Sequence, residues 1–275
     1  MTTQSRQPLT LLRDPKAKDV FHRPEIFVEE NTPWCTGCGY GAWARTLVQE
    51  LERANPAKLV GTVDVACLEY MREIVPGDML QALHGRAVST LRGLKYANPQ
   101  AFAIAFQGDG GMLNEGLNEV IHAAAQGQNI CVILGNNGVL GDTGGQATMG
   151  SAEGLVTPTS QRGRNFEEHG SRIPIAEMLA MFPGTAFVGR VSTHDPAFVY
   201  RGSQVIRKAF EANMAGAGFT FIECMTTCPT GWRMSAVEAI QYQEEHILDK
   251  YPVGIIKDWD PKTHKPREAP LPHRT

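Results

Sequence analysis

The chain contains 275 residues, of which 42% are hydrophobic and 20% charged, and its formal net charge is −3 with a sequence pI near 6.2. These values are typical of a soluble globular protein and exclude a disordered chain or a basic nucleic-acid-binding domain, whose pI usually exceeds about 9. The sequence has no apolar run long enough to span a membrane, and its N-terminus lacks the apolar core of a secretion signal. We therefore expect a cytoplasmic protein with neither a membrane span nor a nucleic-acid partner.

The predicted elements alternate along the chain after an N-terminal arm. Residues 1–33 show neither a helical nor a strand period and are expected to run over a surface. Helices and short apolar runs follow, and the runs have the length and the low polarity of buried strands. In chain order we expect a helix at 40–53, strands at 59–65 and 102–106, a helix at 114–125, a strand at 130–134, a helix at 175–182, a strand at 186–191, a helix at 197–212, a strand at 219–225 and a helix at 235–248.

This order of strands and helices predicts an α/β fold with a mostly parallel sheet flanked by helices on both faces. The predicted domain covers residues 34–257. Residues 258–275 hold four of the 17 prolines and many charges, which is typical of an extended C-terminal tail. In parallel sheets ligands bind outside the carboxyl ends of the strands, so chemistry is expected in the loops that leave those ends.

Two short motifs follow neighbouring predicted strands. Gly108-Asp109-Gly110 follows one strand, Asn136-Asn137 follows the next, and 28 positions separate Asp109 from Asn137. A carboxylate and an amide delivered from adjacent strand ends can meet on one Mg²⁺, which takes oxygen ligands and is completed by substrate phosphates and water. The glycines let the backbone approach a diphosphate, and the following helix offers its amide groups to the anion. A lone GDG is more often a plain turn, so the prediction rests on the pair.

Six cysteines are distributed unevenly along the chain. In a reducing compartment, thiols are more often metal ligands or buried small hydrophobes than disulfide partners. Cys35 and Cys38 form a CxxC pair, which by itself could be half of a structural zinc site. Cys131 lies inside a predicted strand and is expected to be a buried small hydrophobe. Cys224 lies in a predicted strand interior, four residues before Cys228, and is the alternative to Cys228 as a ligand.

Together these motifs resemble one family of thiamine enzymes, the β subunits of the 2-oxoacid:ferredoxin oxidoreductases. GDG and NN match the thiamine diphosphate motif, and residues 138–146 are similar to the loop that follows it in that family. The similarity covers about residues 23–258 and includes four more segments in the family's order. These segments are Trp34-Cys35-Thr36-Gly37-Cys38-Gly39, His84-Gly85-Arg86-Ala87, Cys228-Pro229-Thr230 and residues 251–258.

The resemblance implies a thiamine diphosphate-binding fold of the diphosphate type and assigns roles to individual residues. Asp109, Asn137 and the carbonyl of Val139 would bind Mg²⁺. His84 and Arg86 are candidate catalytic residues, with Arg86 as a partner for a phosphate or carboxylate, although a lone histidine is by default an ordinary surface residue. One [4Fe–4S] cluster would be held by Cys35, Cys38, Cys67 and Cys228. The residues expected to contact the cofactor are Gly37, Gly108, Asp109, Gly110, Gly111, Asn137, Val139, Leu140, Gly141 and Thr143.

The same resemblance implies an activity and partners. The reaction would be the oxidative decarboxylation of a 2-oxoacid with CoA to acyl-CoA and CO₂, with electrons passing from thiamine diphosphate through the cluster to ferredoxin or another acceptor. One sheet fills these 275 residues. A partner α subunit is therefore expected to supply the pyrimidine-binding domain and its catalytic glutamate, and ferredoxin or an electron-transfer subunit is expected beyond the cluster.

Departures from the family pattern cluster where the substrate would lie. Gly111 stands in place of a common second acidic residue, Leu140 in place of the usual tyrosine, and Asp142 in place of methionine or leucine. The loss of an aromatic ring at Leu140 suggests a substrate larger than pyruvate: phenylglyoxylate, a branched-chain 2-oxoacid or 2-oxoglutarate. Two alternatives stay open, namely a non-redox thiamine decarboxylase with structural cysteines and a zinc-stabilised binding module without catalysis.

Overall fold

The computed structural model describes residues 24–26, 32–263 and 265–267. Most of the predicted N-terminal arm, and residues 268–275 of the predicted tail, lie outside the described part of the chain. The strands are β1 (Leu59–Val63), β2 (Asp78–Gln81), β3 (Phe102–Gly108), β4 (Cys131–Asn136), β5 (Val139–Leu140), β6 (Gln146–Ala147), β7 (Thr185–Ser192), β8 (Phe219–Met225), β9 (Gly254–Asp260) and β10 (Lys265–Arg267). The α-helices are α1 (Tyr40–Ala54), α2 (Met71–Ile74), α3 (Ala87–Ala97), α4 (Leu117–Ala125), α5 (Phe166–His169), α6 (Ile175–Ala180), α7 (Pro196–Met214), α8 (Pro229–Trp232) and α9 (Ala236–Tyr242).

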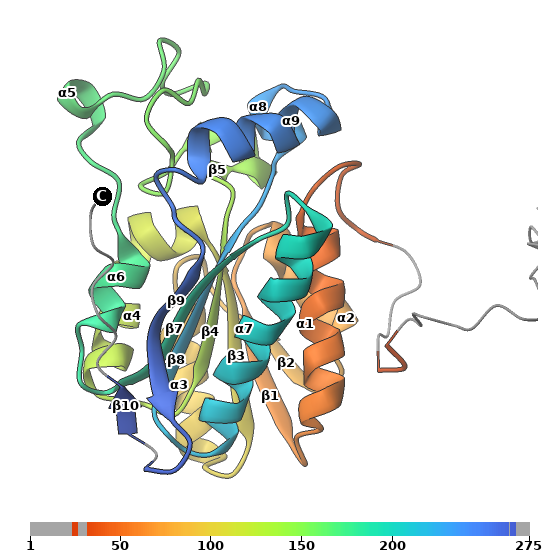
Figure 1. The fold of residues 1–275 in the computed structure, drawn as a ribbon, viewed down its shortest axis with the longest axis vertical. Helices are drawn as coiled ribbons and strands as arrows, with labels where there is room; N and C mark the ends of the chain where they lie inside the picture. The colour runs from red at the N-terminus through yellow and green to blue at the C-terminus, as the bar shows by residue number, and fades with distance from the viewer. Residues whose placement is uncertain (1–23, 27–31, 264, 268–275) are drawn as a thin grey trace, which may run out of the picture.

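Eight of these strands form one twisted sheet in the order β10-β9-β7-β8-β4-β3-β1-β2 (Figure 1). The six strands from β7 to β2 are parallel, whereas β9 runs antiparallel to β7 and β10 antiparallel to β9. Each parallel connection returns through helical segments, as this topology requires. The predicted α/β fold with a mostly parallel sheet is confirmed.

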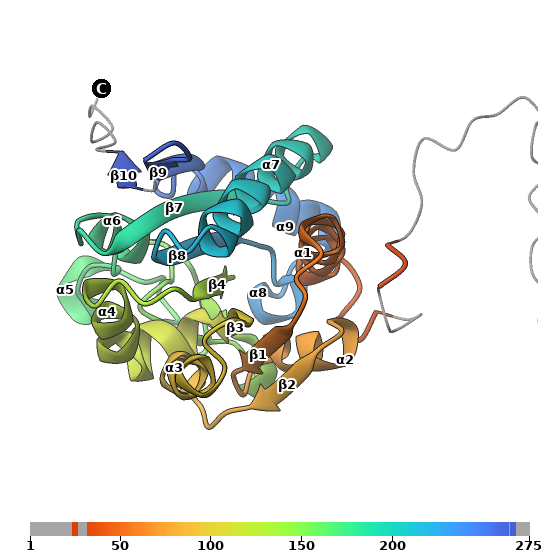
Figure 2. The same ribbon diagram turned by 90° about the horizontal axis from the view of Figure 1, so that it is seen from below.

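Helices cover both faces of the sheet (Figure 2). One apolar cluster packs α1, α2 and α7 against the sheet, and a second packs α3, α4 and α6 against its other face. Along β3, Ile104 and Phe106 belong to the first cluster while Ala103 and Ala105 belong to the second, as the two-residue period of a strand dictates. Both faces of β3 are thus buried, which explains its uninterrupted apolar sequence.

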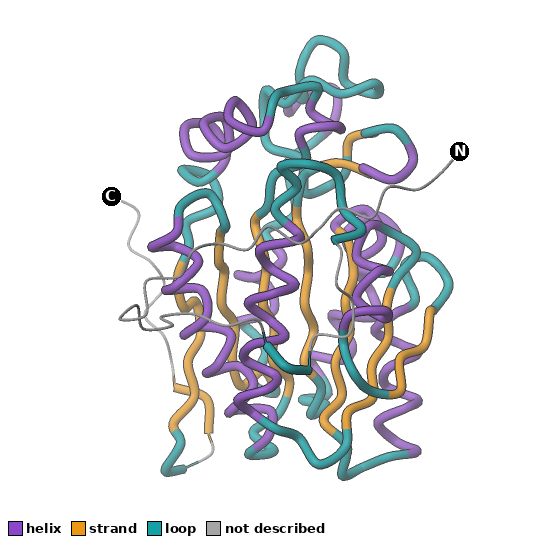
Figure 3. The backbone as a smooth tube through the Cα atoms, turned by 90° about the vertical axis from the view of Figure 1, so that its right-hand side faces the viewer, coloured by secondary structure: helices purple, strands orange, loops and turns teal. Residues whose placement is uncertain are grey.

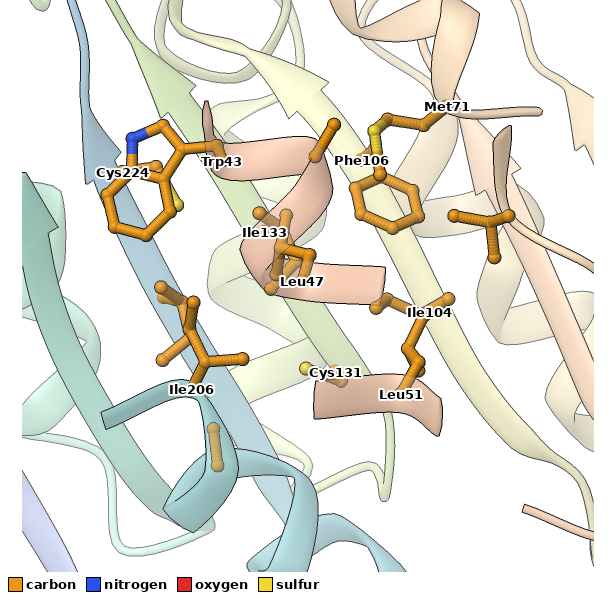
Figure 4. Packing of buried hydrophobic residues seen from close by; sticks show 14 of the residues in the cluster. Trp43, Leu47, Leu51, Met71, Ile104, Phe106, Cys131, Ile133, Ile206 and Cys224 are labelled. Carbon is orange, nitrogen blue, oxygen red and sulfur yellow. The ribbon is translucent and has the colours of Figure 1, made fainter. Parts of the chain in front are cut away.

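The first of these clusters is centred on α1. Its residues Trp43, Leu47 and Leu51 lie one helical turn apart and face the strands, where they meet Ile104 and Ile133 (Figure 4). All five side chains are at most 1% exposed. The packing fixes the start of α1, and with it the CxxC turn that precedes it, over the carboxyl ends of the strands.

A layer of short helices and loops lies beyond the strand ends (Figure 3), and it encloses a third, smaller apolar cluster. It combines β5, α8, α9 and the loop around residue 152, with Trp232 and Tyr251 as its largest buried side chains. The Tyr251 hydroxyl donates a hydrogen bond to the carbonyl of Gly150 at 2.7 Å. This cluster holds the site loops down on the sheet.

The structure differs from the prediction mainly at short or exposed elements. The edge strand β2, the helix α3 and the small hairpin β5–β6 were not predicted. Residues 114–125 do not form one helix, because a π-helical turn at Gly110–Glu115 precedes α4, and a second π-helical turn, Gln243–Ile247, completes the predicted last helix. The predicted tail begins inside β9, whose Trp259 is 7% exposed, so its first three residues belong to the sheet rather than to an arm.

No helix in the described ranges is both long and apolar enough to cross a membrane.

Candidate functional site

The loops that leave β1, β3 and β4 surround one cavity at the carboxyl end of the sheet. The strand register explains why they meet: Gly108 of β3 pairs with Gly135 of β4, so Asp109 and Asn136 follow at the same level. The cavity is lined by Tyr40, Val65, Ala66, Cys67, His84, Gly108, Asp109, Gly110, Gly111, Asn137, Val139, Leu140, Gly141, Asp142 and Thr143. Most of the predicted cofactor-contacting residues are therefore brought together in one place.

Asp109 is the central acidic group of this cavity. It caps the start of the π-helical turn, is 2% exposed, and accepts hydrogen bonds from the Thr148 hydroxyl and from the backbone amides of Asn137 and Gly110. Burial raises the pKa of Asp109 to about 7 in spite of these hydrogen bonds, which lower it. A divalent cation at this carboxylate would offset the cost of burying its charge.

Asn136 and Asn137 are fixed by different partners. The Oδ1 of Asn137 accepts a hydrogen bond from the Val139 amide at 3.1 Å, and the Asn137 carbonyl accepts one from the Trp232 indole at 2.9 Å. Asn136 donates from Nδ2 to Glu223 at 2.8 Å and accepts from the Gly138 amide at 3.1 Å. Gly138 has φ +70°, a conformation that favours glycine. The turn that would present Asn137 and Val139 to a metal is thus set by Asn136 beneath it.

A buried ion pair supports Asn136 from below. The Arg190 Nε lies 2.7 Å from Glu223 Oε2, and both side chains are completely buried. Arg190 also donates to both carboxylate oxygens of the partly exposed Glu177, at 2.8 and 2.9 Å. Although burial lowers the pKa of Arg190, its two carboxylate partners raise it well above its ordinary value. The side chain therefore stays charged and couples β7, β8 and α6 to the asparagine turn.

Four of the six cysteines gather beside the cavity. Cys35 and Cys38 lie in the turn before α1, Cys67 begins the turn after β1, and Cys228 directly precedes α8. A Cβ added at Gly141 would lie 3.2 Å from the sulfur of Cys228 and 3.7 Å from that of Cys67. The two sulfurs are therefore separated by no more than the sum of these distances.

The cysteines raise one another's pKa values, which also indicates that they lie close together. Burial raises the pKa of Cys67 to about 12, and the negative charges of Asp142, Cys228, Cys38 and Cys35 raise it further. Burial likewise raises the pKa of Cys38 to about 12. Thiolates at these positions would need a strong positive partner. Within the described residues, however, no three His, Cys, Asp or Glu side chains converge tightly enough for one metal ion.

The other two cysteines are confirmed as core residues. Cys131 is 0% and Cys224 2% exposed, and both lie in the cluster beneath α1, on β4 and β8. Burial raises the pKa of both thiols, and Cys131 adds to the effect at Cys224. The alternative in which Cys224 replaces Cys228 is disfavoured, because Cys228 is the one that meets Cys67 next to Gly141.

Aromatic side chains enclose the cysteine group on the side of α1. Trp34 donates from its indole to the Cys67 carbonyl at 2.6 Å and packs against Tyr40 and Tyr70, with ring centroids 6.3 and 6.4 Å away. Tyr40 lines the cavity and donates its hydroxyl to the Gly135 carbonyl at 3.2 Å. Burial raises the pKa of Tyr40, so it stays neutral. Cys35 is the exposed member of the quartet.

The two predicted catalytic residues lie differently. His84 lines the cavity, and its Nδ1 lies 2.6 Å from the Glu115 carboxylate. Arg86 does not line it, since its guanidinium pairs with Glu119 on α4 and with the Glu115 carbonyl at 3.2 Å. Gly37 is also outside the cavity; it has φ +78° in the CxxC turn, and an added Cβ there would overlap with Ala236.

Several residues of the site belong to none of the predicted motifs. Thr148 is separated from Asp109 by 39 positions, and only the folded hairpin brings its hydroxyl to the carboxylate. Tyr40 carried a weak signal, because it follows the CxxC turn. Trp232, four residues after Cys228, gave no signal for its contact with Asn137.

Comparisons with known proteins point to one group. Residues 60–224 match the family model of the C-terminal thiamine pyrophosphate-binding domain of thiamine pyrophosphate enzymes. The chain is 31% identical over 246 residues to ketoisovalerate oxidoreductase subunit VorA of Methanothermobacter thermautotrophicus, covering 89% of this chain and 52% of VorA. It is 30% identical over 245 residues to 2-oxoacid:ferredoxin oxidoreductase subunit beta of Saccharolobus solfataricus, covering 86% and 72%. It is 29% identical over 225 residues to 2-oxoglutarate synthase subunit KorB of Archaeoglobus fulgidus, covering 82% and 80%.

The chain spans about half the length of the VorA relatives that it matches. Among solved structures, the fold resembles the 2-oxoglutarate:ferredoxin oxidoreductase of Magnetococcus marinus, described with 2-oxoglutarate, coenzyme A and succinyl-CoA bound. The TM-score is 0.72 with 20% sequence identity, covering 91% of this chain and 87% of that one. At this identity the likeness establishes the shared fold.

Proposed function

The chain belongs to the 2-oxoacid:ferredoxin oxidoreductase family, among its thiamine pyrophosphate-binding β subunits, and from this premise we propose that it catalyses the oxidative decarboxylation of a 2-oxoacid. With CoA the products would be acyl-CoA and CO₂, and the electrons would leave through an iron–sulfur cluster. Thiamine diphosphate supplies the electron sink for loss of CO₂, and a cluster accepts electrons singly. The residues of this chain bind and orient both groups.

The cavity residues fit a diphosphate held through Mg²⁺. Asp109 and Asn137 would provide two oxygen ligands and the Val139 carbonyl a third, with diphosphate and water completing the shell. Gly110 lines the cavity and packs closely against Leu140, since a Cβ added at Gly110 would lie 2.0 Å from the Leu140 side chain. The buried, unneutralised Asp109 is the observation in favour of a cation here.

The observation that carries the redox function is the position of Gly141. An added Cβ at this residue would lie within 3.7 Å of two thiol sulfurs and of the Asn137 amide. A cluster held by Cys35, Cys38, Cys67 and Cys228 would therefore border the diphosphate site directly. A cubane binds each thiolate to a different iron, so its four ligands stand farther apart than those of one zinc ion.

The mouth of the cavity fits a partner subunit. Val65 is 40% exposed, Leu80 47% and Leu83 79%, and all three lie at the end of β1 and along the edge strand β2, next to His84. We propose that an α subunit covers this apolar edge and delivers a pyrimidine-binding domain with its catalytic glutamate. We propose that electrons leave toward ferredoxin or an electron-transfer subunit near Cys35, which is exposed. We place the assembly in the cytoplasm, where thiols stay reduced.

The substrate is proposed to be larger than pyruvate. Leu140 lines the cavity beside Gly110, and its side chain carries no aromatic ring that would take up room there. Two of the relatives are named for ketoisovalerate and 2-oxoglutarate, which are both larger 2-oxoacids. We rank a branched-chain 2-oxoacid first, then 2-oxoglutarate and phenylglyoxylate. His84, at the cavity wall, is the residue of this chain placed to contact the substrate, whereas Arg86 is engaged by α4.

The test is the composition of the complex purified without oxygen. We expect about four irons and four acid-labile sulfides per copy of this chain beyond those in partner subunits. Thiamine diphosphate and Mg²⁺ should accompany them. Cys67→Ser should lose most of that iron, whereas the control Cys131→Ser, in the core, should keep it. Zinc without sulfide would refute the redox function, and a higher kcat/KM with pyruvate than with the three larger acids would refute the substrate proposal.

A further inference from the structure

The proposed function assigns no role to Asp64, which is a buried carboxylate. It directly follows β1, is 0% exposed, and its Oδ1 accepts a hydrogen bond from the Gly85 amide at 2.8 Å. Its Oδ2 makes no hydrogen bond of normal geometry among the described residues, although the Gln107 side chain and the Val65 amide lie close enough to stabilise the carboxylate. Buried carboxylates are rare unless they hold something in place, because burying a charge is costly.

The Oδ2 oxygen of Asp64 lies in the space of another residue's side chain. A Cβ added at Gly111 would stand 1.7 Å from the Asp64 Oδ2, so a side chain at this position would require the Asp64 carboxylate to move. Gly111 has no left-handed φ that would explain its glycine, so the contact with Asp64 is the constraint. The space beside Gly111 is therefore filled by a carboxylate that comes from the end of β1.

Asp64 also joins two segments that line the cofactor cavity. Gly85 has φ +76°, and a Cβ added there would lie 3.2 Å from the Gly111 carbonyl. The Gly111 carbonyl in turn accepts the Gly116 amide at 2.8 Å, which closes the π-helical turn that begins after Asp109. Through Gly85, Asp64 therefore fastens the turn of His84 to the turn of Asp109.

We propose that Asp64 is a positioning residue of the thiamine diphosphate half-site, whose carboxylate takes the place of a side chain at Gly111. This inference rests on the proposed function. A carboxylate carried by residue 111 would point into the space that the Asp64 Oδ2 now fills, so the same place could be reached from either strand end. The two arrangements are mutually exclusive, because both together would put two carboxylates in one buried site.

The test is an exchange of the two residues in the complex with its partner subunits. Four variants are compared with the unaltered protein: Asp64→Gly, Gly111→Asp, the double exchange Asp64→Gly/Gly111→Asp, and the control Gly93→Asp. Gly93 lies exposed on α3 and has no atom within 4 Å of an added Cβ, so it accepts a carboxylate freely. After removal of bound cofactor, the Kd for thiamine diphosphate with Mg²⁺ is measured by calorimetry, together with the melting temperature.

We expect each single exchange to weaken cofactor binding by about tenfold or more, because a buried hydrogen bond is lost or a second carboxylate is forced in. The double exchange should return the Kd to within about threefold of the unaltered protein. A Gly111→Asp variant that binds normally, or a double exchange that binds no better than the weaker single variant or does not fold, would overturn the proposal. Rescue of the melting temperature without rescue of the Kd would show a merely structural role and also overturn it. Failure of the unaltered protein to bind the cofactor would instead refute the proposed function.

Discussion

The ion pair of Arg190 with Glu223 offers the sharpest test of how the site is supported. Both side chains are 0% exposed, and their Nε and Oε2 atoms lie 2.7 Å apart. In Arg190→Met the methionine fills most of the volume but leaves Glu223 buried without its cation. Removing one partner of a buried pair costs roughly 3–5 kcal/mol. Since about 1 kcal/mol shifts the melting temperature of a large domain by roughly 2–4 °C, the midpoint should fall by on the order of 10 °C.

The assay is thermal unfolding of the purified assembly, followed by cofactor affinity at a temperature where the variant is folded. Lys208→Met is the matched control, because Lys208 pairs with Asp258 at 2.9 Å and its side chain is 46% exposed. Exposed pairs contribute about 0–1 kcal/mol, so the control should shift the midpoint by a few degrees at most. Adding Glu223→Gln to Arg190→Met removes the stranded charge and should recover most of the loss.

A melting temperature for Arg190→Met within a few degrees of the unaltered protein would refute this account of the ion pair. A further fall of the melting temperature on adding Glu223→Gln would refute it too. It is also refuted if the affinity for thiamine diphosphate is unchanged in the folded Arg190→Met variant. Glu223 accepts the Asn136 amide at 2.8 Å, so a displaced carboxylate must disturb the turn that presents Asn137. A loss of stability without a loss of cofactor affinity would mean that the Arg190–Glu223 ion pair stabilises the core but does not position Asn137.

Three other predictions concern the cluster and the acid side of the pH profile. Gly141→Ala places a Cβ 3.2 Å from the nearest of the four thiols and should lower iron and sulfide content; the control Gly93→Ala, with open space around it, should not. Asp142→Asn removes a negative charge beside the cluster cysteines and should raise the reduction potential in a redox titration; an unchanged or lower potential would contradict this. Burial raises the pKa of Glu177, but the hydrogen bonds and charge of Arg190 outweigh it and lower that pKa below its ordinary 4.5. The folded state then binds fewer protons than the unfolded chain, so this stabilisation is complete above about pH 4.5 and is lost as the pH falls through the lowered pKa. In the Arg190→Met variant, the fall of the melting temperature that Glu177 causes at acidic pH should disappear. An unchanged dependence of the melting temperature on pH would contradict this prediction.

The central strands could be predicted because burial on both faces removes polar residues from them. β3 and β4 lie between the two apolar clusters, so their sequences are continuous apolar runs with no competing signal. The edge strand β2 could not be found this way, since Asp78 and Gln81 are exposed and its pairing depends on β1. β9 was missed for a related reason: its alternation is weak, and it joins the sheet antiparallel at an edge.

For the site, motifs predicted which residues gather but not how they are held. Asp109 and Asn137 follow paired strands, so their proximity is a consequence of topology that the spacing already contained. The support of these residues is not local. Thr148 and Glu223 reach the site across 39 and 87 positions, and polar residues of their kind occur throughout the chain. The ion pair of Arg86 with Glu119 on α4 is another contact that its motif did not predict.

The short segment from Asn137 to Asp142 links the two halves of the proposed chemistry. Asn137 and Val139 line the cavity proposed to hold the diphosphate. Gly141 stands against the sulfurs of Cys67 and Cys228, and the negative charge of Asp142 raises the pKa of Cys67. Because one turn carries both sets of contacts, a displacement that opens the metal site must also move the wall of the cluster. We therefore expect changes of substrate specificity at Leu140, which lines the cavity and whose side chain stands against Gly110.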